Sequence, residues 1–298
     1  MTTFSDNHDY SKISIGILGL GAIGCLISSQ LPRAYNSFAL LRNETKQIDF
    51  SVFHQHESKN YNLPAWQGEL LDVLIICCKA TQTLAALSQW RSAIGPDTQI
   101  VILQNGFGQH EQVHNLFPQN TIFAASTTEG ANKKSRFEIN HAGIGITQWG
   151  YFAGPKAKLK LNLKQLDGTH QANTQIKQIL LDKLAINSVI NPLTVKYNCS
   201  NGELLTNKIA FTELKQLCME IESVFHKMDW PLSFNLLERS QQVAQQTSKN
   251  ISSMLQDVRN SQKTEIDYIN GYLINKATEN NIKSPLNKSL VEYIKNIM

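Results

Sequence analysis

A strand-like run that passes directly into a glycine-rich turn constrains the fold of this 298-residue chain more than any other segment. The run extends from Ile13 to Leu18, and the turn reads Gly19-Leu20-Gly21-Ala22-Ile23-Gly24. In a dinucleotide-binding turn the first glycine permits the tight bend, the second lets the backbone approach a pyrophosphate, and the third lets the next helix pack closely. Because Cys25 to Leu31 is compatible with that helix, the motif stands in its proper context. Residues 19–24 are therefore predicted to bind a dinucleotide.

A cation stands at the end of the second predicted strand, Phe38 to Leu41. Enzymes that use NAD usually place a carboxylate there to accept from the ribose 2′-hydroxyl, whereas the 2′-phosphate of NADP needs a positive charge. Arg42 therefore favours NADPH/NADP+ as the cofactor. Glu44 is the competing ribose ligand, but it lies two residues beyond the expected position.

Two polar residues follow predicted strands further along the first half. Lys79 ends the continuous apolar run Asp72 to Cys78, which is typical of a strand covered on both faces. Asn105 follows the run Ile100 to Leu103. Open α/β sheets bind ligands at the carboxyl ends of their strands, so both residues are candidates for a site. A solvated lysine and an ordinary Asn-Gly turn remain the alternatives.

The remaining patterns of this half are weaker. Phe50 to Phe53 is compatible with a strand, and a turn is expected around Asn60 to Pro64. The adjacent Cys77 and Cys78 are interpreted as strand residues.

The second half is predicted to be helical, because from Ile176 onward apolar residues recur mostly at intervals of three and four. The first helix should run to Ile190 and stop at Pro192. The segment Ser200 to Glu203 matches a capping box, so Glu203 is expected to start the next helix. The helix that begins at Glu203 is expected to run to about 228. Further helices are expected at 234–243 and from 250 onward. The fold class is therefore an amino-terminal α/β dinucleotide-binding domain of Rossmann type, 11–174, followed by an all-α domain, 175–298.

Two of these helices carry concentrated polar faces. Lys183, Asn187 and Asn191 recur at intervals of four, and at about 100° per residue they lie on one face. A single long helix from Asn250 would gather a second polar face made of Asn250, Ser253, Asp257, Ser261, Thr264, Glu265 and Tyr268. Together the faces offer a lysine and a glutamate, which could serve as a proton donor and a polar anchor for a small hydroxylated acid. The alternative is that both faces are simply solvated.

Composition narrows the class of protein. The formal charge of +4 is mild and no basic run is present, so we expect no nucleic-acid partner. The longest apolar run has only six residues, which is too short for a membrane helix, and the polar first ten residues argue against a signal peptide. Five cysteines without C-x-x-C spacing suit a reducing, cytoplasmic location. The eight histidines are scattered, so no metal site is expected.

Two long motifs in the second half resemble the signature segments of the ketopantoate reductase (2-dehydropantoate 2-reductase) family. They are N-S-V-I-N-P-L-T followed by N-C-S-N-G-E-L, and N-I-S-S-M-L-Q-D-V-R followed by T-E-I-D-Y-I-N-G. The similarity runs from about Ile13 to Leu290 and includes C-K-A-T-Q and the N-G-x-G segment at Asn105. It implies NADPH-dependent reduction of ketopantoate to pantoate in pantothenate and coenzyme A biosynthesis. The sequence leaves the oligomeric state open, with a homodimer as one option.

The resemblance also implies roles for particular residues. Lys183 would be the general acid, because a protonated lysine stabilises the developing alkoxide and can then donate its proton. Glu265 would accept a hydrogen bond from the substrate hydroxyl. Lys79 and Asn105 would lie near the nicotinamide and the substrate. The substrate oxygens would be held by Asn187, Asn191, Asn250 and Ser253.

Some features depart from the family or fall outside its chemistry. The segment 151–175 is poorly patterned, so the end of the first domain is uncertain by several residues, while 121–128 and 141–147 resemble remaining strands. His141 is expected to be structural, and Glu129 is given no function. Two alternative functions remain: a related 2-keto acid reductase with another substrate, or a non-enzymatic NADP(H)-binding regulator.

Overall fold

The computed structural model describes residues 13–298 except 43, 44 and 56. The chain forms two compact units. The first contains the described residues up to Gln104 together with His110–Ile176, and the second contains Asn105–Gln109 together with Lys177–Met298. The pentapeptide Asn105–Gln109 is thus part of the second unit, although its neighbours on both sides in the chain belong to the first.

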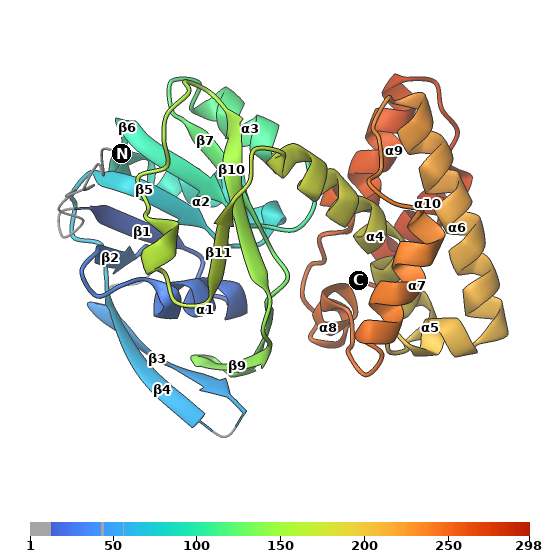
Figure 1. The fold of residues 1–298 in the computed structure, drawn as a ribbon, viewed down its shortest axis with the longest axis horizontal. Coiled ribbons are helices and arrows are strands. Elements are labelled where there is room, and N and C mark those ends of the chain that lie inside the picture. The colour runs from blue at the N-terminus through green and yellow to red at the C-terminus, as the bar shows by residue number, and fades with distance from the viewer. Residues whose placement is uncertain (1–12, 43–44, 56) are drawn as a thin grey trace, which may run out of the picture. The chain divides into compact units, whose positions relative to one another are not determined.

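A mostly parallel sheet forms the framework of the first unit (Figure 1). Among the described residues seven strands take the order β11-β10-β7-β6-β5-β1-β2. Their bounds are β1 Ser14–Leu18, β2 Asn36–Ala39, β5 Leu71–Ile76, β6 Ile94–Ile102, β7 Ile122–Thr127, β10 Ile146–Ala153 and β11 Thr169–Ala172. The five neighbouring strands β2, β1, β5, β6 and β7 are parallel, whereas β10 is antiparallel to β7. The strand order reverses at β1, which has β2 on one side and β5 on the other. Open α/β sheets bind ligands at such a switch point, beyond the carboxyl ends of the strands.

Helix α1 (Ala22–Gln30) lies between this sheet and a second, smaller one (Figure 1). The described strands of the smaller sheet take the order β4-β3-β9-β8, with bounds β3 Gln47–His54, β4 Glu57–Pro64, β8 Gly130–Ser135 and β9 Glu138–Gly143. One buried apolar cluster joins the layers and includes Ile15 of β1, Ile27 of α1, Phe50 of β3 and Ile139 of β9. The other helical segments of this half are η2 Ala80–Gln82, α2 Thr83–Gln89, η3 Arg91–Ala93, α3 Gln109–Leu116 and η4 Leu163–Gln165.

The structure corrects two details predicted for this half. Asn60 to Pro64 is not a turn but part of β4, which pairs with β3 along its whole length. Asparagine and proline are tolerated because β4 is an edge strand and Pro64 is its last residue. Strand β5 ends at Ile76, so Cys77 and Cys78 lie just beyond it, although both backbone amides still donate to the oxygen of Leu18 at 2.8 and 3.0 Å.

The second unit is helical in all its described regular elements (Figure 1). Their bounds are α4 Ile176–Tyr197, α5 Glu203–Thr206, α6 Lys208–Lys227, α7 Leu236–Gln246, α8 Ser253–Arg259, η5 Ile266–Tyr268, α9 Asn270–Glu279 and α10 Pro285–Asn296. The capping box is only half formed. The backbone amide of Ser200 donates to Glu203 Oε2 at 2.7 Å, but the N-cap residue of α5 is Gly202 and no side chain caps the start of this helix. Asn207 then interrupts the next helix, since its side chain caps α6 by accepting from Ile209 and Ala210.

Two helix boundaries differ from the sequence expectation. Helix α4 does not stop at Pro192 but continues to Tyr197, because a side chain from α9 replaces the backbone donor that the proline lacks. The segment 250–268 is not one helix. Helix α8 ends at Arg259, Ser261 adopts a positive φ of 52°, and the amide of Gln262 turns back to the oxygen of Asp257 at 2.8 Å. The residues expected on a single polar face therefore belong to separate elements.

Candidate functional site

The glycine turn after β1 has the local geometry of a phosphate-binding turn. Gly19 has a φ of +101°, and a Cβ there would overlap the backbone of Cys78. A Cβ at Gly24 would overlap the carbonyl oxygen of Gly19. By contrast, a Cβ at Gly21 would meet nothing within 4 Å. The protein's own packing thus requires the first and third glycines, while the second faces open space, as expected if a ligand approaches the backbone there.

The beginning of α1 adds electrostatic complementarity to this turn. Gly21 is the N-cap residue, and no side chain accepts a hydrogen bond from the first turn of the helix. That turn, Ala22 to Gly24, also contains no acidic residue. A helix N-terminus without side-chain caps presents backbone N–H groups and a partial positive charge, which suits a pyrophosphate. The residues present therefore fit a dinucleotide.

Arg42 and Lys79 follow the carboxyl ends of two strands of the first unit. Arg42 is exposed and comes three residues after β2. Lys79 is half-buried and comes three residues after β5, directly before η2. The competing ribose ligand, Glu44, lies outside the described residues.

A buried glutamine that the sequence analysis passed over joins the ends of β5 and β6. Gln104 donates through Nε2 to the backbone oxygen of Cys78 and, at 2.8 Å, to the hydroxyl of Thr83. Thr83 is fully buried. Gln104, which directly precedes Asn105, is thus bound to both sides of the segment that carries Lys79. A polar residue at the end of the apolar run 100–103 was the available signal.

The predicted polar face of α4 is formed. Lys183, Asn187 and Asn191 all lie on this helix; the first two are half-buried and Asn191 is buried. Loss of hydration lowers the pKa of Lys183 to about 8, while the negative charge of Glu265 opposes this shift. Lys183 and Glu265 are therefore electrostatically coupled, although they lie on elements far apart in the sequence.

The second polar set is divided between separate elements. Glu265 is half-buried and directly precedes η5, whereas Asn250 and Ser253 are exposed around the start of α8. Ser252, the residue between them that is buried, caps α8 by accepting from the amide of Leu255 at 3.1 Å. Its hydroxyl also lies 2.6 Å from that of Thr194, one turn after Asn191 on α4. The start of α8 is thus fixed to the polar helix α4.

Asn201 is a second candidate that the sequence analysis missed. Its backbone amide donates to the oxygen of Asn250 at 2.9 Å, and its Nδ2 donates to Thr247 Oγ1 at 2.8 Å. Its Oδ1 is buried and accepts no hydrogen bond from any residue that the structure describes. A buried amide oxygen without a protein donor is free to accept from a bound molecule or a water. Its place in the run N-C-S-N-G-E-L was the signal.

His141, for which a structural role was expected, contacts Glu129 and His54 within the first unit. Its Nε2 lies 2.6 Å from Glu129 Oε2, and the same carboxylate oxygen accepts from the amide of Gly145 at 3.0 Å. The ring also packs against His54, with 5.1 Å between the ring centroids. Glu129 and His141 therefore join β9 to the β7–β8 connection, which contains Glu129, and to the β9–β10 connection, which contains Gly145.

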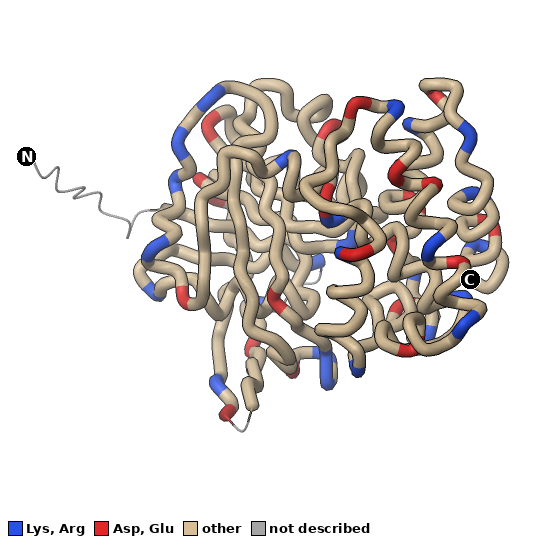
Figure 2. Tube along the Cα trace, turned by 45° about the vertical axis from the view of Figure 1, so that its right-hand side comes forward, with Lys and Arg blue, Asp and Glu red and all other residues tan. Residues whose placement is uncertain are grey.

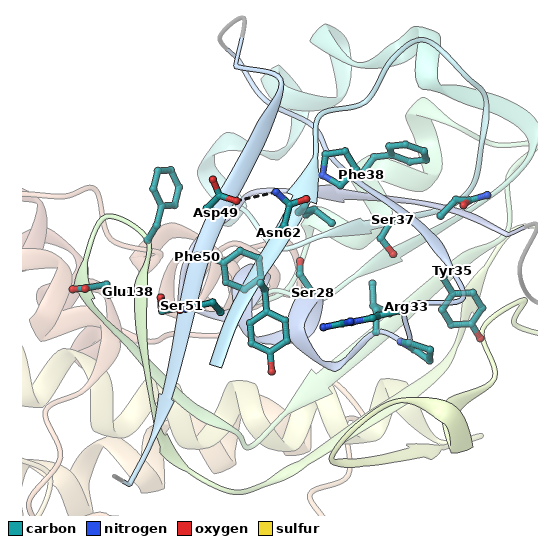
Figure 3. A pocket seen from close by; sticks show the side chains of 18 of the residues that line it. Ser28, Arg33, Tyr35, Ser37, Phe38, Asp49, Phe50, Ser51, Asn62 and Glu138 are labelled. Atoms are coloured by element: carbon teal, nitrogen blue, oxygen red, sulfur yellow. Dashed lines mark hydrogen bonds between the residues drawn. The ribbon is translucent and has the colours of Figure 1, made fainter. Parts of the chain in front are cut away.

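The first unit also contains a cavity of about 950 Å³ away from the predicted residues. It is bounded by the end of α1, the edge strand β2, the β3–β4 hairpin and the β8–β9 turn, and Figure 3 shows Arg33, Ser37 and Phe50 among its side chains. Asn62 Nδ2 donates to Asp49 Oδ1 at 2.8 Å beside it. None of the predicted site residues lines this cavity.

The described part of the chain has neither a metal-binding cluster nor a membrane-spanning helix. It contains no group of three or more His, Cys, Asp and Glu side chains that could hold a metal ion. None of its helices is long and apolar enough to cross a membrane. Figure 2 shows Lys and Arg interspersed with Asp and Glu along the trace.

Comparisons with known proteins cover nearly the whole chain. Residues 15–154 match the family model described as ketopantoate reductase PanE/ApbA, and residues 175–298 match the model for the C terminal part of the same family. A 2-dehydropantoate 2-reductase from Shigella flexneri is 32% identical over 95% of this chain and 94% of the relative.

Solved structures share the fold. A probable 2-dehydropantoate 2-reductase from Bacillus subtilis superposes with a TM-score of 0.82 at 28% identity, over 96% of this chain and 100% of that one. A D-mandelate dehydrogenase in complex with NADH and anilino(oxo)acetate superposes with a TM-score of 0.85, over 96% of this chain and 98% of that one. At 19% identity the latter likeness concerns the fold alone.

Proposed function

We propose that this chain, which belongs to the ketopantoate reductase (PanE/ApbA) family of oxidoreductases, reduces ketopantoate to pantoate with NADPH, a step of pantothenate synthesis. The observation that carries the proposal is the face of α4, where Lys183, with a pKa lowered to about 8, shares a helix with Asn187 and Asn191. A lysine whose pKa lies this close to neutral pH can readily donate its proton to a keto oxygen, and the neighbouring amides can orient a polar acid.

The two halves of the chain would divide the work. Residues 11–174 would form the NADP-binding domain, and residues 175–298 would form the domain that binds substrate and supplies the proton. The turn from Gly19 to Gly24 supports the first assignment, because Gly21 is open and the start of α1 is uncapped. Arg42 would hold the 2′-phosphate, which would select NADPH over NADH. Lys79 and Asn105 would contact the nicotinamide end of the cofactor and the substrate.

Bound NADPH would supply the hydride that adds to the ketone carbon. Lys183 would hold its proton on Nζ within reach of the keto oxygen, stabilise the negative charge that develops there, and then donate the proton to it. The opposing influences on its pKa serve this role: burial favours release of the proton, while Glu265 keeps enough of the side chain protonated at neutral pH.

Polar residues around Lys183 would bind and orient the substrate. Glu265 would accept from the substrate hydroxyl, and the neutral side chains Asn187, Asn191, Asn250 and Ser253 would hold its hydroxyl and carboxylate oxygens. Asn201 joins this proposal because its amide oxygen is buried next to Asn250. Neutral donors suit the task because they bind the substrate without adding charge to the site.

A related 2-keto acid is the main alternative substrate, since the same fold occurs in a D-mandelate dehydrogenase and fold alone does not select the keto acid. A steady-state assay of NADPH oxidation with ketopantoate beside pyruvate, 2-ketoisovalerate and phenylglyoxylate tests the choice. We expect the highest kcat/KM with ketopantoate. A higher value with another acid would reassign the substrate, and binding of NADPH without turnover of any acid would favour a regulator.

A further inference from the structure

The segment that carries Asn105 is held by the helical unit through backbone contacts. The amide of Phe107 donates to the backbone oxygen of Tyr268 at 2.8 Å. Gly106, with a φ of +85°, lies so close to this oxygen that a Cβ would come within 2.5 Å of it. The turn closes on itself, because Gln109, fully buried, donates through Nε2 to the oxygens of Asn105 and Gly106 at 3.2 and 3.3 Å.

A row of aromatic rings anchors the same segment to the core of the helical unit. The ring of Phe107 lies 5.2 Å from that of Tyr272 on α9, and Tyr272 stacks on Trp230 at 6.0 Å with an interplanar angle of 10°. Trp230 in turn meets the buried Phe225 of α6 edge-on at 5.5 Å. Gly108, with a φ of +98°, leaves room for Tyr272, because a Cβ there would come within 2.9 Å of the ring.

The element that receives Phe107 also presents Glu265. In η5 the amides of Tyr268 and Ile269 donate to the backbone oxygen of Glu265 at 3.0 and 3.1 Å. The same turn of backbone therefore holds two groups. At its amino end it holds Glu265, and through the oxygen of Tyr268 it holds the segment that carries Asn105. The backbone contacts that set the distance between the side chains of Asn105 and Glu265 therefore lie inside one compact unit.

We propose that Tyr272 is a positioning residue, which acts with the backbone of Tyr268 to hold Asn105 in fixed register with Glu265. Tyr272 does this through its ring, which packs on Phe107 and fits against Gly108. Asn105 thus belongs functionally with the proton-donating half of the chain, although it follows a strand of the nucleotide-binding half. The proposal rests on the role of Asn105 in the proposed reductase.

The contact itself can be tested without any assay of activity. Hydrogen exchange should be measured on the intact protein for the peptide that covers Phe107, in wild type, Tyr272→Leu and Tyr272→Phe. Leucine removes the ring, so we expect faster exchange of the Phe107 amide, whereas phenylalanine keeps the ring and should exchange like wild type. Tyr293→Leu is the matched control, because Tyr293 is exposed on α10. Equal exchange in Tyr272→Leu and wild type would overturn the proposal.

The positioning role is tested by a double-mutant cycle in the reduction of ketopantoate. Tyr272→Leu should lower kcat by roughly 10–100-fold, because misplacement of a substrate-contacting group by about 1 Å costs that much. In an Asn105→Ala background the same change should cost less than about twofold, because a residue that acts through Asn105 has nothing left to position. Tyr272→Phe should restore kcat.

The outcomes separate this proposal from the proposed function. A wild-type protein that fails to reduce ketopantoate would refute the proposed function, and the exchange of the Phe107 amide would still decide whether Tyr272 holds the segment. An active wild type with equal losses from Tyr272→Leu in both backgrounds would refute the positioning role and leave the reductase intact. A second variant, Gly106→Ala, should also lower kcat because its Cβ would meet Tyr268. Gly68→Ala has a positive φ as well but meets nothing within 4 Å, and is its control.

Discussion

Asn270 donates a hydrogen bond through Nδ2 to the backbone oxygen of Ser188 at 2.8 Å. In an uninterrupted helix that oxygen would accept from the amide of residue 192, but Pro192 has no N–H. Asn270 supplies the missing donor, and α4 therefore continues through the proline. The same Nδ2 donates to Asn287 Oδ1 at 2.8 Å, and Asn287 Nδ2 donates to Glu220 at 2.8 Å. A buried polar network thus joins α4, α9, α10 and α6 next to the turn that carries Asn187 and Asn191.

The network predicts a stability effect that depends on the proline. Asn270→Ala should lower the free energy of unfolding by about 1–3 kcal/mol, because it leaves a buried carbonyl without a donor. In a Pro192→Ala background the loss should be smaller, since the new amide can donate to the oxygen of Ser188. Urea unfolding followed by circular dichroism measures both values. The same loss in both backgrounds would contradict this account of α4.

Arg42 predicts the cofactor preference. Arg42→Ala removes a charge-assisted contact to the 2′-phosphate, which should cost about 1.5–3 kcal/mol in NADPH affinity. The apparent KM for NADPH should rise much more than that for NADH, as steady-state kinetics with each cofactor would show. Arg33→Ala, an exposed arginine in the same unit, is the control and should change neither value. If Arg42→Ala raised the apparent KM for NADPH and for NADH equally, Arg42 would not be the residue that binds the 2′-phosphate.

Loss of the Lys183 side chain should impair the chemical step and leave cofactor binding unchanged. Lys183→Ala should lower kcat by roughly 10²–10⁴-fold, which is the usual contribution of a general acid. The dissociation constant for NADPH, measured by calorimetry without substrate, should stay near the wild-type value. Lys208→Ala, an exposed lysine at the start of α6, serves as the control. A Lys183→Ala variant that keeps more than about a tenth of wild-type kcat would exclude this role.

The pKa of Lys183 predicts the pH dependence of reduction. The acid form holds its proton below the pKa of about 8, so the rate should be high at lower pH and fall as the pH rises through about 8. The carboxylate of Glu265 raises this pKa, so Glu265→Gln should move the inflection to lower pH. Profiles of kcat/KM against pH test both statements, with the exposed Glu292→Gln as control. An inflection that does not move in Glu265→Gln would show that the two residues are not coupled.

The sequence by itself determined the features that depend on neighbouring residues. The glycine turn is one, because only glycine tolerates the positive φ of Gly19 and the contact between Gly24 and the oxygen of Gly19. The face shared by Lys183, Asn187 and Asn191 is another, because helical spacing alone aligns them. The start of α5 at Glu203 is a third, because its carboxylate accepts from the nearby amide of Ser200.

Tertiary structure decided the features that depend on partners far away in the chain. Pro192 reads as a helix end, yet Asn270, 82 positions after Ser188 in the chain, donates to the Ser188 oxygen and allows α4 to continue. The segment after Asn250 reads as one amphipathic helix, yet Ser252 binds Thr194 and Ser261 turns the chain. Asn105 follows a strand of the first unit, yet Tyr268 and Tyr272 hold its segment in the second. Periodicity and local propensity describe a backbone one turn at a time, whereas these outcomes depend on hydrogen bonds and ring contacts that exist only once distant elements have packed together.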